Sequence, residues 1–423
     1  MLLKMAIRNV ARHKRRTFLT VITMAVGLMF FIFFDSLFVG IDRMVVEGLV
    51  KYSDSSIIIY SKEYDENKKA YPLKKGIKDV DRIFKLAQSF KDVEGVATRT
   101  QFLGEIAYYG KSKYIIGTVI DPELDGKVFE LKDSVKEGKY FSDGENEVII
   151  GIDLARELGI TVGETITIIA QTKYETHNAL DFVVSGLIST TIPSINEASL
   201  ILTYRGAEKL LDLEGSITSI HIKVKWPKGE SIPSYTKRVA NIANSLQKDL
   251  PEYKVYNFMD IYGEFLLLMQ QKKATTFIIT FLILLIAGVG IVNTILMAVY
   301  ERIKEIGVLL AMGFKPKEIR RLFLLEGMVI GVIGGLAGVL LGVLADLWLI
   351  YSGYNLEAIF STAASGIKPS EIGMPVWGVI YGEWNFGAFV LSFCFGLTVA
   401  LISAYIPARY ASKLKVTECL RFV

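Results

Sequence analysis

The chain has 423 residues and a formal net charge of +4; 51% of its residues are hydrophobic and 22% are charged. Because the positive charges gather beside apolar runs, we attribute them to membrane topology and expect no nucleic acid as a partner. Its cysteines, Cys394 and Cys419, both lie near the C-terminus, so we expect no disulfide in the long polar stretch before them.

Long apolar runs lie near the N-terminus and after residue 273, with a mostly polar segment between them. A helix of about 20 apolar residues crosses a hydrocarbon core about 30 Å thick. Ala274–Tyr300, Gly327–Ala345 and Phe386–Ala408 are uncharged and have about this length. The sequence predicts an α-helical membrane protein with four transmembrane helices in a 1 + 3 arrangement, at residues 17–41, 274–300, 322–350 and 386–408.

The first apolar run has a second interpretation, a cleaved signal peptide, because a basic region precedes it. The run is long for a signal, however, and Asp35-Ser36-Leu37-Phe38 after it offers no small-x-small cleavage site. We therefore interpret residues 17–41 as a transmembrane helix.

Basic residues in the short flanks predict the orientation, since Lys and Arg accumulate on the cytoplasmic side of a membrane. Residues 1–16, a predicted basic amphipathic helix, and the connection 301–321 are rich in them, whereas the connection 351–385 has only Lys368. We predict a multi-pass protein of the inner (cytoplasmic) membrane with both termini inside. The predicted cytoplasmic parts are 1–16, 301–321 and the tail 409–423, and the predicted extracytoplasmic parts are 42–273 and 351–385.

Residues 42–273 are predicted to form a large mixed α/β domain. Short β-branched runs indicate strands, and apolar residues at helical spacing indicate helices. The strand after Gly163 is expected to pair with Phe182–Ile188 as a hairpin across Thr172–Ala179. The other predicted elements are strands at 51–60, 147–151 and 253–256, and helices at 80–90, 154–159 and 234–250, followed by a helical stalk at 260–271 that leads into the second span.

Residues that would support catalysis are scarce. The chain has three histidines, and neither His177 nor His221 in the large domain stands in a metal-ligand spacing. A couple of His177 and Asp181 on the hairpin is conceivable, but a solvated turn is the favoured interpretation. No nucleophile motif and no Gly-x4-Gly-Lys-Ser/Thr phosphate loop occurs. We predict no catalytic residue, no metal site and no ATP hydrolysis in this chain.

The connection 301–321 is the most specific segment. An apolar stripe through Ile303, Ile306, Leu309 and Leu310 opposes a face with charged residues such as Glu305. Gly313 is expected to end this helix and Pro316 to begin the next at its favoured first-turn position. Such an amphipathic elbow either lies as a solvated loop against the membrane or docks another protein.

Motifs in this segment and elsewhere give the chain a family resemblance. Glu301-Arg302-x-x-Glu305-Ile306-Gly307, Ala311-Met312-Gly313 and Phe323-Leu324-Leu325-Glu326-Gly327 follow one another here. Together with Ala6–Thr17, Glu147–Gly163 and Pro407–Arg421, they resemble the permeases of the MacB/FtsX/LolC-LolE group of ABC transporters over nearly the whole chain. In that group this segment contacts the ATPase, so the resemblance implies ATPase-coupling roles for Glu301, Arg302, Glu305, Ile306, Gly307, Met312 and Gly313.

Departures from the individual members narrow the resemblance. MacB proteins carry a fused ATPase that this chain lacks, and FtsX proteins have a much smaller outer domain. LolC proteins have a proline-containing hook, whereas Thr172–Ala179 is short and has no proline. The chain thus looks closer to LolE or to a generic lipoprotein-releasing permease. An FtsX-like signalling permease that controls an extracytoplasmic enzyme and a MacB-type efflux permease remain the alternatives.

The resemblance also implies the partners and the mechanism. ATP and Mg²⁺ would be bound by separate cytoplasmic ATPase subunits, with no cofactor in this chain. A second identical or similar permease, membrane lipid, an acylated lipoprotein cargo and, optionally, a periplasmic carrier would complete the system. ATP-driven closure of the ATPases would move the spans and, through the stalk, the outer domain, so that the cargo is extracted from the outer leaflet.

Two further sets of residues are predicted to have a role, one in helix packing and one in cargo entry. Glycines at every fourth position of the third span predict close helix packing, although glycine is also common in membrane helices without special reason. These are Gly327, Gly331 and Gly335 on one face, and Gly334, Gly338 and Gly342 on the adjoining face. Apolar residues at the outer membrane boundary are candidates for cargo entry, or else simply face lipid: Phe34, Leu37, Phe38, Phe265, Leu268 and Met269.

We expect no ion path through the membrane. The charged residues within the third span's extent, Glu326 and Asp346, both stand near its ends in the sequence. An ionisable group deep in the membrane would be the expected mark of such a path.

Overall fold

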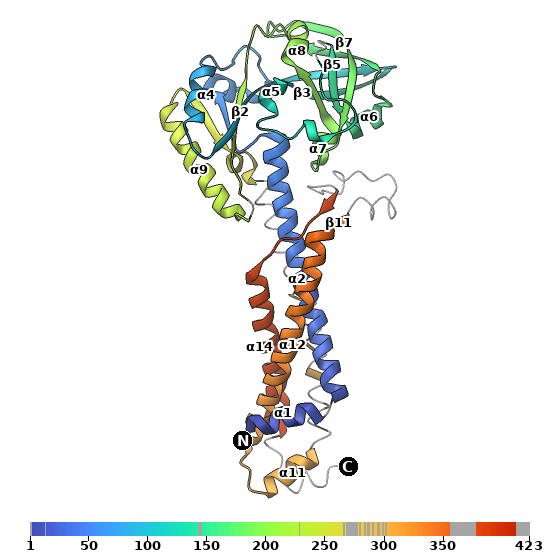
Figure 1. Ribbon diagram of the computed structural model, residues 1–423, viewed down its shortest axis with the longest axis vertical. Coiled ribbons are helices and arrows are strands. Elements are labelled where there is room, and N and C mark those ends of the chain that lie inside the picture. The colour runs from blue at the N-terminus through green and yellow to red at the C-terminus, as the bar shows by residue number, and fades with distance from the viewer. Residues whose placement is uncertain are drawn as a thin grey trace. The chain divides into compact units, whose positions relative to one another are not determined.

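The computed structural model describes residues 2–12, 14–142, 146–227, 229–264, 303–355 and 378–411, together with single positions between 265 and 302. The chain divides into two compact units with separate cores (Figure 1). The helical unit comprises residues 1–41, 269–355 and 379–423, and the sheet unit comprises residues 42–268 and 356–378.

Long apolar helices dominate the helical unit. Among the described residues, three helices are long and apolar enough to cross a membrane, namely Thr17–Ser53, Pro316–Ser352 and Phe386–Ile406. The predicted second span, the stalk beyond residue 264, most of the connection 351–385 and the tail after residue 411 lie outside the described residues, so the count of four spans stays a prediction. The helices are α1 (Leu2–Arg12), α2 (Lys14–Gly48), α11 (Ile303–Ala311), α12 (Pro316–Ser352) and α14 (Phe386–Ala411).

The sheet unit holds a mixed sheet whose described strands run in the order β10-β1-β9-β2-β3-β8-β5-β7-β4, with β6 paired to both β2 and β7. The strands are β1 (Ile57–Ser61), β2 (Val93–Tyr108), β3 (Lys111–Ile120), β4 (Val135–Gly138), β5 (Glu147–Gly151), β6 (Thr165–Gln171), β7 (His177–Ile188), β8 (Ser199–Thr203), β9 (Ser219–Val224) and β10 (Tyr253–Asn257). The helices around them are α3 (Lys62–Glu66), α4 (Val80–Gln88), α5 (Pro122–Asp125), α6 (Ile152–Leu158), α7 (Pro193–Ala198), α8 (Tyr204–Leu211) and α9 (Ile232–Asp249).

Strand pairing closes one part of this sheet into a ring. The pairs β2–β3, β3–β8, β8–β5, β5–β7, β7–β6 and β6–β2 return to the strand where they began. Inward side chains fill the ring with a buried apolar core, including Phe102, Ile150, Ile168 and Phe182. Closure pairs the strand edges of this barrel-like lobe with one another and so removes most free edges.

The N-terminal half of β2 belongs to a second lobe with β9, β1 and β10. Helices α4 and α9 lie beside these strands (Figure 1) and cover them with buried residues such as Ile83, Tyr235 and Leu246. Because β2 is shared, the two lobes have separate cores but one continuous sheet. The burial of apolar surface on both sides of β2 holds the lobes together.

Among the described residues of this domain, the structure confirms the predicted hairpin and the glycine that ends a helix, and it corrects one predicted strand. The pairing Ile166↔Phe182 to Gln171↔His177 confirms the hairpin, and Gly159 ends α6 with a φ of +81°. The strand predicted from residue 51 begins only at Ile57, because α2 continues through a π-helical turn, Leu49–Ser53. Ser55, with a φ of +64°, then turns the chain into β1.

Candidate functional site

The elbow folds against the ends of two long helices. Ile303 and Ile306 of α11 are buried with Ile319 and Phe323 of α12 and with Ala408 of α14. Gly313, with a φ of +95°, ends the turn after α11, which favours glycine at this position. The Glu318 carboxylate accepts a hydrogen bond from the Lys315 backbone N–H at 2.8 Å, which caps the start of α12.

The predicted coupling residues fall into two groups in the structure. Ile306 and Gly307 are buried inside the elbow, so they hold α11 in place instead of presenting a surface. Glu305, Met312 and Gly313 are exposed, and Met312 has 72% of its surface accessible. Glu301 and Arg302 lie outside the described residues.

The first glycine face of α12 meets α14. A Cβ atom built at Gly331 would lie 2.9 Å from the Ala400 Cβ, and one at Gly335 would lie 2.9 Å from Cδ2 of Phe393. Gly327 meets Ala404 in the same way. Real Cβ atoms do not approach this closely, so the two backbones can be neighbours only because the residues are glycine.

The second glycine face of α12 meets α2. Built Cβ atoms at Gly334 and Gly338 would lie 2.7 Å from Sδ of Met24 and 2.8 Å from the Leu28 Cβ. Gly342 meets Ile32. The two predicted stripes therefore serve two different helices, and α2, α12 and α14 lie side by side in the helical unit (Figure 1).

The candidate cargo-entry residues are only partly described. Phe34, Leu37 and Phe38 lie on α2 and are half-buried. Phe34 stacks on Phe30, whose side chain is 45% exposed, with ring centroids 6.3 Å apart. Phe265, Leu268 and Met269 lie outside the described residues, so the proximity of the two halves of this candidate site stays a prediction.

A buried polar cluster in the sheet unit was not anticipated from the sequence. Arg99 of β2 donates to the Asp125 carboxylate at 2.7 and 3.3 Å and to the Ser53 carbonyl at 2.9 Å, and its guanidinium lies over the Phe129 ring. Arg99 and Asp125 are 26 residues apart in the sequence and belong to no motif that we recognised. Their pairing therefore becomes visible only in the folded structure. With both charges buried, it ties the end of α2's extension to the sheet.

His221 belongs to the same cluster. Its Nδ1 lies 3.0 Å from the Asp54 carbonyl and its Nε2 lies 2.9 Å from the Ser219 hydroxyl. Burial, aided by the positive charge of Arg99, lowers the pKa of His221 to about 4. Tyr262 completes the cluster by donating to the Asp54 carboxylate, so the segments before and after the sheet unit's core meet here.

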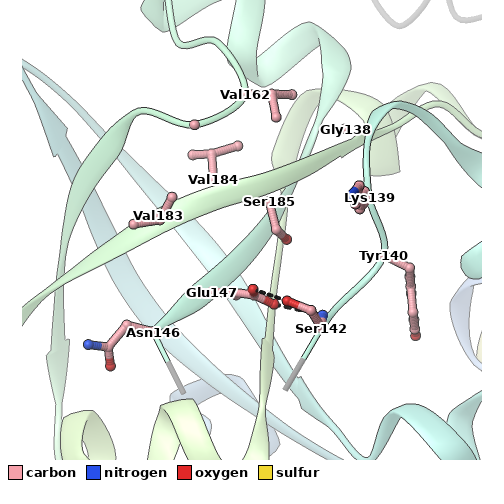
Figure 2. A pocket seen from close by; sticks show the side chains of 11 residues that line it. Gly138, Lys139, Tyr140, Ser142, Asn146, Glu147, Val162, Val183, Val184 and Ser185 are labelled. Carbon is pink, nitrogen blue, oxygen red and sulfur yellow. Dashed lines mark hydrogen bonds between the residues drawn. The ribbon is translucent and has the colours of Figure 1, made fainter. Parts of the chain in front are cut away.

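A cavity of about 640 Å³ opens in the sheet unit where the partner of β7 changes from β6 to β4. Figure 2 shows Val162, Val183 and Val184 on one side of it, and Ser142 bonded to Glu147 on another. Among the described lining residues Glu147 is the one carboxylate, and both the backbone N–H and the hydroxyl of Ser142 donate to it. The described lining thus combines an apolar side with a polar side on which the Glu147 carboxylate is already bonded to Ser142.

His177 and Asp181 form no catalytic couple. The Asp181 carboxylate accepts a hydrogen bond from the Thr167 hydroxyl at 2.7 Å, across the hairpin. His177 pairs with Gln171 at the exposed end of the same hairpin. Within the described residues no group of three or more His, Cys, Asp and Glu side chains is placed to hold a metal ion.

Apolar helices of membrane-spanning length and a glycine-packed helical unit indicate a membrane protein, which also carries a large α/β unit. The model for the MacB-like periplasmic core domain matches residues 17–242, and the model for the FtsX-like permease C-terminal matches residues 277–416. The chain belongs to this family and is an ABC transporter permease of the LolC/MacB/FtsX group.

Individual relatives span the group. The lipoprotein-releasing system transmembrane protein LolC of Neisseria meningitidis is 23% identical over 98% of this chain and 98% of its own length. An uncharacterized ABC transporter permease of Methanocaldococcus jannaschii is 27% identical over 98% of this chain and 96% of its own length. The macrolide export ATP-binding/permease protein MacB of Haemophilus ducreyi is 24% identical over 98% of this chain, which covers 55% of that protein.

Proposed function

We propose that this chain is the permease subunit of an ATP-driven transporter that extracts lipoproteins from the outer leaflet of the inner membrane. The single observation that carries the proposal is the end-to-end match to LolC, which covers 98% of both chains. MacB-type efflux is the second candidate, favoured by the MacB-like model over residues 17–242. Both functions need force from ATP, which we assign to cytoplasmic ATPase subunits in separate chains.

The elbow is the proposed docking surface for that ATPase. Val308 and Met312 are 50% and 72% exposed on α11, beside the exposed acidic Glu305. An exposed apolar residue with a neighbouring charge suits a protein interface better than bulk water. Ile306 and Gly307, buried beneath, fix the elbow to α12 and α14, so that a push on α11 would reach the membrane helices.

The buried polar cluster is the proposed link from the first span to the sheet unit. Arg99 and His221 hold the carbonyls of Ser53 and Asp54, at the end of the helix that α2 begins. Tyr262 reaches the same point from the segment that leads toward the second predicted span. Movement of either span would therefore pull on β2 and β9. The proposed orientation keeps both termini in the cytoplasm and the sheet unit outside.

Site-specific crosslinking tests the lipoprotein assignment. Photo-crosslinkers at Phe34, Leu37 and Met269 should capture an acylated protein when ATP is withheld, because the acyl chains would lie beside the outer end of α2. Phe18, 62% exposed near the other end of α2, is the matched control position. Capture of a non-acylated small molecule instead would favour efflux, and failure at all three positions would contradict cargo entry here.

A further inference from the structure

The packing seam between α2 and α12 consists of glycines against apolar side chains, but at one end it contains two polar residues. Gly334, Gly338 and Gly342 meet Met24, Leu28 and Ile32, so both helices advance by four residues per contact. The next step of four residues along each helix leads to Asp346 on α12 and Ser36 on α2. A carboxyl and a hydroxyl thus occupy positions where the rest of the seam has glycine against a large apolar side chain.

Both side chains are sealed from solvent. Asp346 is 0% exposed and Ser36 is 2% exposed. Gly382 lies against Ser36: a Cβ built at Gly382 would lie 2.5 Å from Oγ of Ser36 and 2.9 Å from Cδ2 of Leu349. Within the described part of the chain, the Asp346 carboxyl oxygens and Oγ of Ser36 have no hydrogen-bond partner.

Within the described ranges, no Lys, Arg or His side chain is bonded to the Asp346 carboxyl. Asp35, on α2 beside Ser36, is the charged group that acts on Asp346, and its carboxylate already accepts from the Asn385 amide at 2.6 Å. Segment 381–385 contributes Tyr381 and Glu383 as its titratable side chains, and α14 contributes Cys394 and Tyr405 before its first basic residue, Arg409. At the opposite end of α12, by contrast, the buried Glu326 accepts from the Asn9 amide at 2.6 Å.

An ionised carboxyl without a partner is strongly disfavoured in such a place, and the group neutralises instead. We propose that Asp346 is a proton-binding site that latches the α2–α12 seam. In the closed seam the carboxyl carries its proton and faces Ser36. Ionisation of Asp346 would place a second negative charge near Asp35 in a seam without water. Loss of the proton from Asp346 would therefore open this end of the α2–α12 seam. The proposed latch requires that α2 and α12 lie in a membrane, and it would apply whatever the cargo is.

Infrared difference spectroscopy on the full-length chain tests the protonation. The wild-type minus Asp346→Asn spectrum at neutral pH should contain the carbonyl stretch of a protonated carboxyl, shifted by deuterium exchange. Ser36→Ala should move that band, because the serine faces the proton, which a merely structural role would not do. Glu326→Gln is the matched control and should leave the band in place. A difference spectrum with carboxylate bands instead would overturn the proposal.

A thiol-accessibility measurement tests the latch. A Leu349→Cys probe in a chain with Cys394→Ser and Cys419→Ser reports opening, because Leu349 packs under Gly382 and is 0% exposed. The rate of labelling by a water-soluble maleimide is compared with and without Asp346→Asn, so that the thiol's own ionisation cancels. The labelling rate with Asp346 present, divided by the rate with Asp346→Asn, should rise at least several-fold from neutral to alkaline pH. A ratio that stays constant would overturn the latch.

Discussion

At the scale of single residues, the buried cluster around Arg99 holds the segment at Ser53 and Asp54, where the chain enters the sheet unit. Arg99 and Asp125 form a side-chain ion pair, Arg99 also donates to the backbone carbonyl of Ser53, and His221 Nδ1 bonds to that of Asp54. Removing one member of a buried pair leaves the other uncompensated. The cluster therefore fixes one conformation of the entry point.

His221 makes the stability of this unit depend on pH. Its pKa is lowered from 6.5 in the unfolded chain to about 4 in the fold, so between these values the unfolded state binds more protons. Stability is fully present above pH 6.5 and is lost as the pH falls, by about 3 kcal/mol on reaching pH 4. Hydrogen exchange of the β9 amides in the full-length chain measures this loss.

The comparison that isolates His221 uses two variants. His221→Gln should flatten the acid side of this profile relative to wild type, whereas His177→Gln, at an exposed position on β7, should leave it unchanged. Carboxylates titrate in both variants and cancel in the comparison. Equal slopes for wild type and His221→Gln would mean that the buried imidazole does not account for the pH dependence.

At the scale of elements, α12 is the axis of the helical unit because it presents one glycine stripe to α14 and another to α2. Gly338→Leu and Gly335→Leu should each destabilise the unit by about 1–3 kcal/mol, through overpacking against Leu28 and Phe393. Thermal melting in detergent measures the effect. Leu340→Phe, at a position that is 63% exposed on the same helix, is the control. Unchanged melting of both glycine variants would contradict helix packing there.

The elbow α11 makes a separate prediction. Met312→Asp and Glu305→Lys change exposed positions, so they should lower stimulation of the partner ATPase several-fold without affecting membrane insertion. Gly307→Leu should act through the fold, because Gly307 is buried. The measurement is ATP hydrolysis by the co-purified complex, with Asp81→Lys on α4 as the control for an acid-to-base change. Wild-type stimulation in both elbow variants would place the ATPase contact elsewhere.

Local signals made much of the architecture predictable at this scale. Gly159 after β5 and α6, the β6–β7 hairpin and the four-residue glycine repeat each follow from residues close together in sequence. The closed ring of strands did not follow, because pairs such as β2 with β6 and β3 with β8 join distant segments. Asp346 was expected near a span end and not as a buried group, because the packing of α12 against α2 joins segments that are distant in sequence.

At the scale of the whole molecule, the family match and the helical unit agree on a permease, and the resemblance to the LolC/MacB/FtsX group was visible in the sequence. The glycine stripes pack α2, α12 and α14 into one unit. The elbow helix α11 packs against the start of α12 and the end of α14. Such an arrangement suits the transfer of force from an ATPase to the helices. It does not by itself distinguish lipoprotein release from efflux.

Release of an acylated protein from a reconstituted membrane decides between them. The chain, purified with its native partners, is placed in proteoliposomes that carry a fluorescent triacylated lipoprotein in the leaflet facing the sheet unit. The account predicts that ATP and Mg²⁺ release the acylated protein into the medium, that non-hydrolysable ATP does not, and that Met312→Asp lowers release several-fold. Steady ATP hydrolysis with the acylated protein still in the membrane would contradict the assignment.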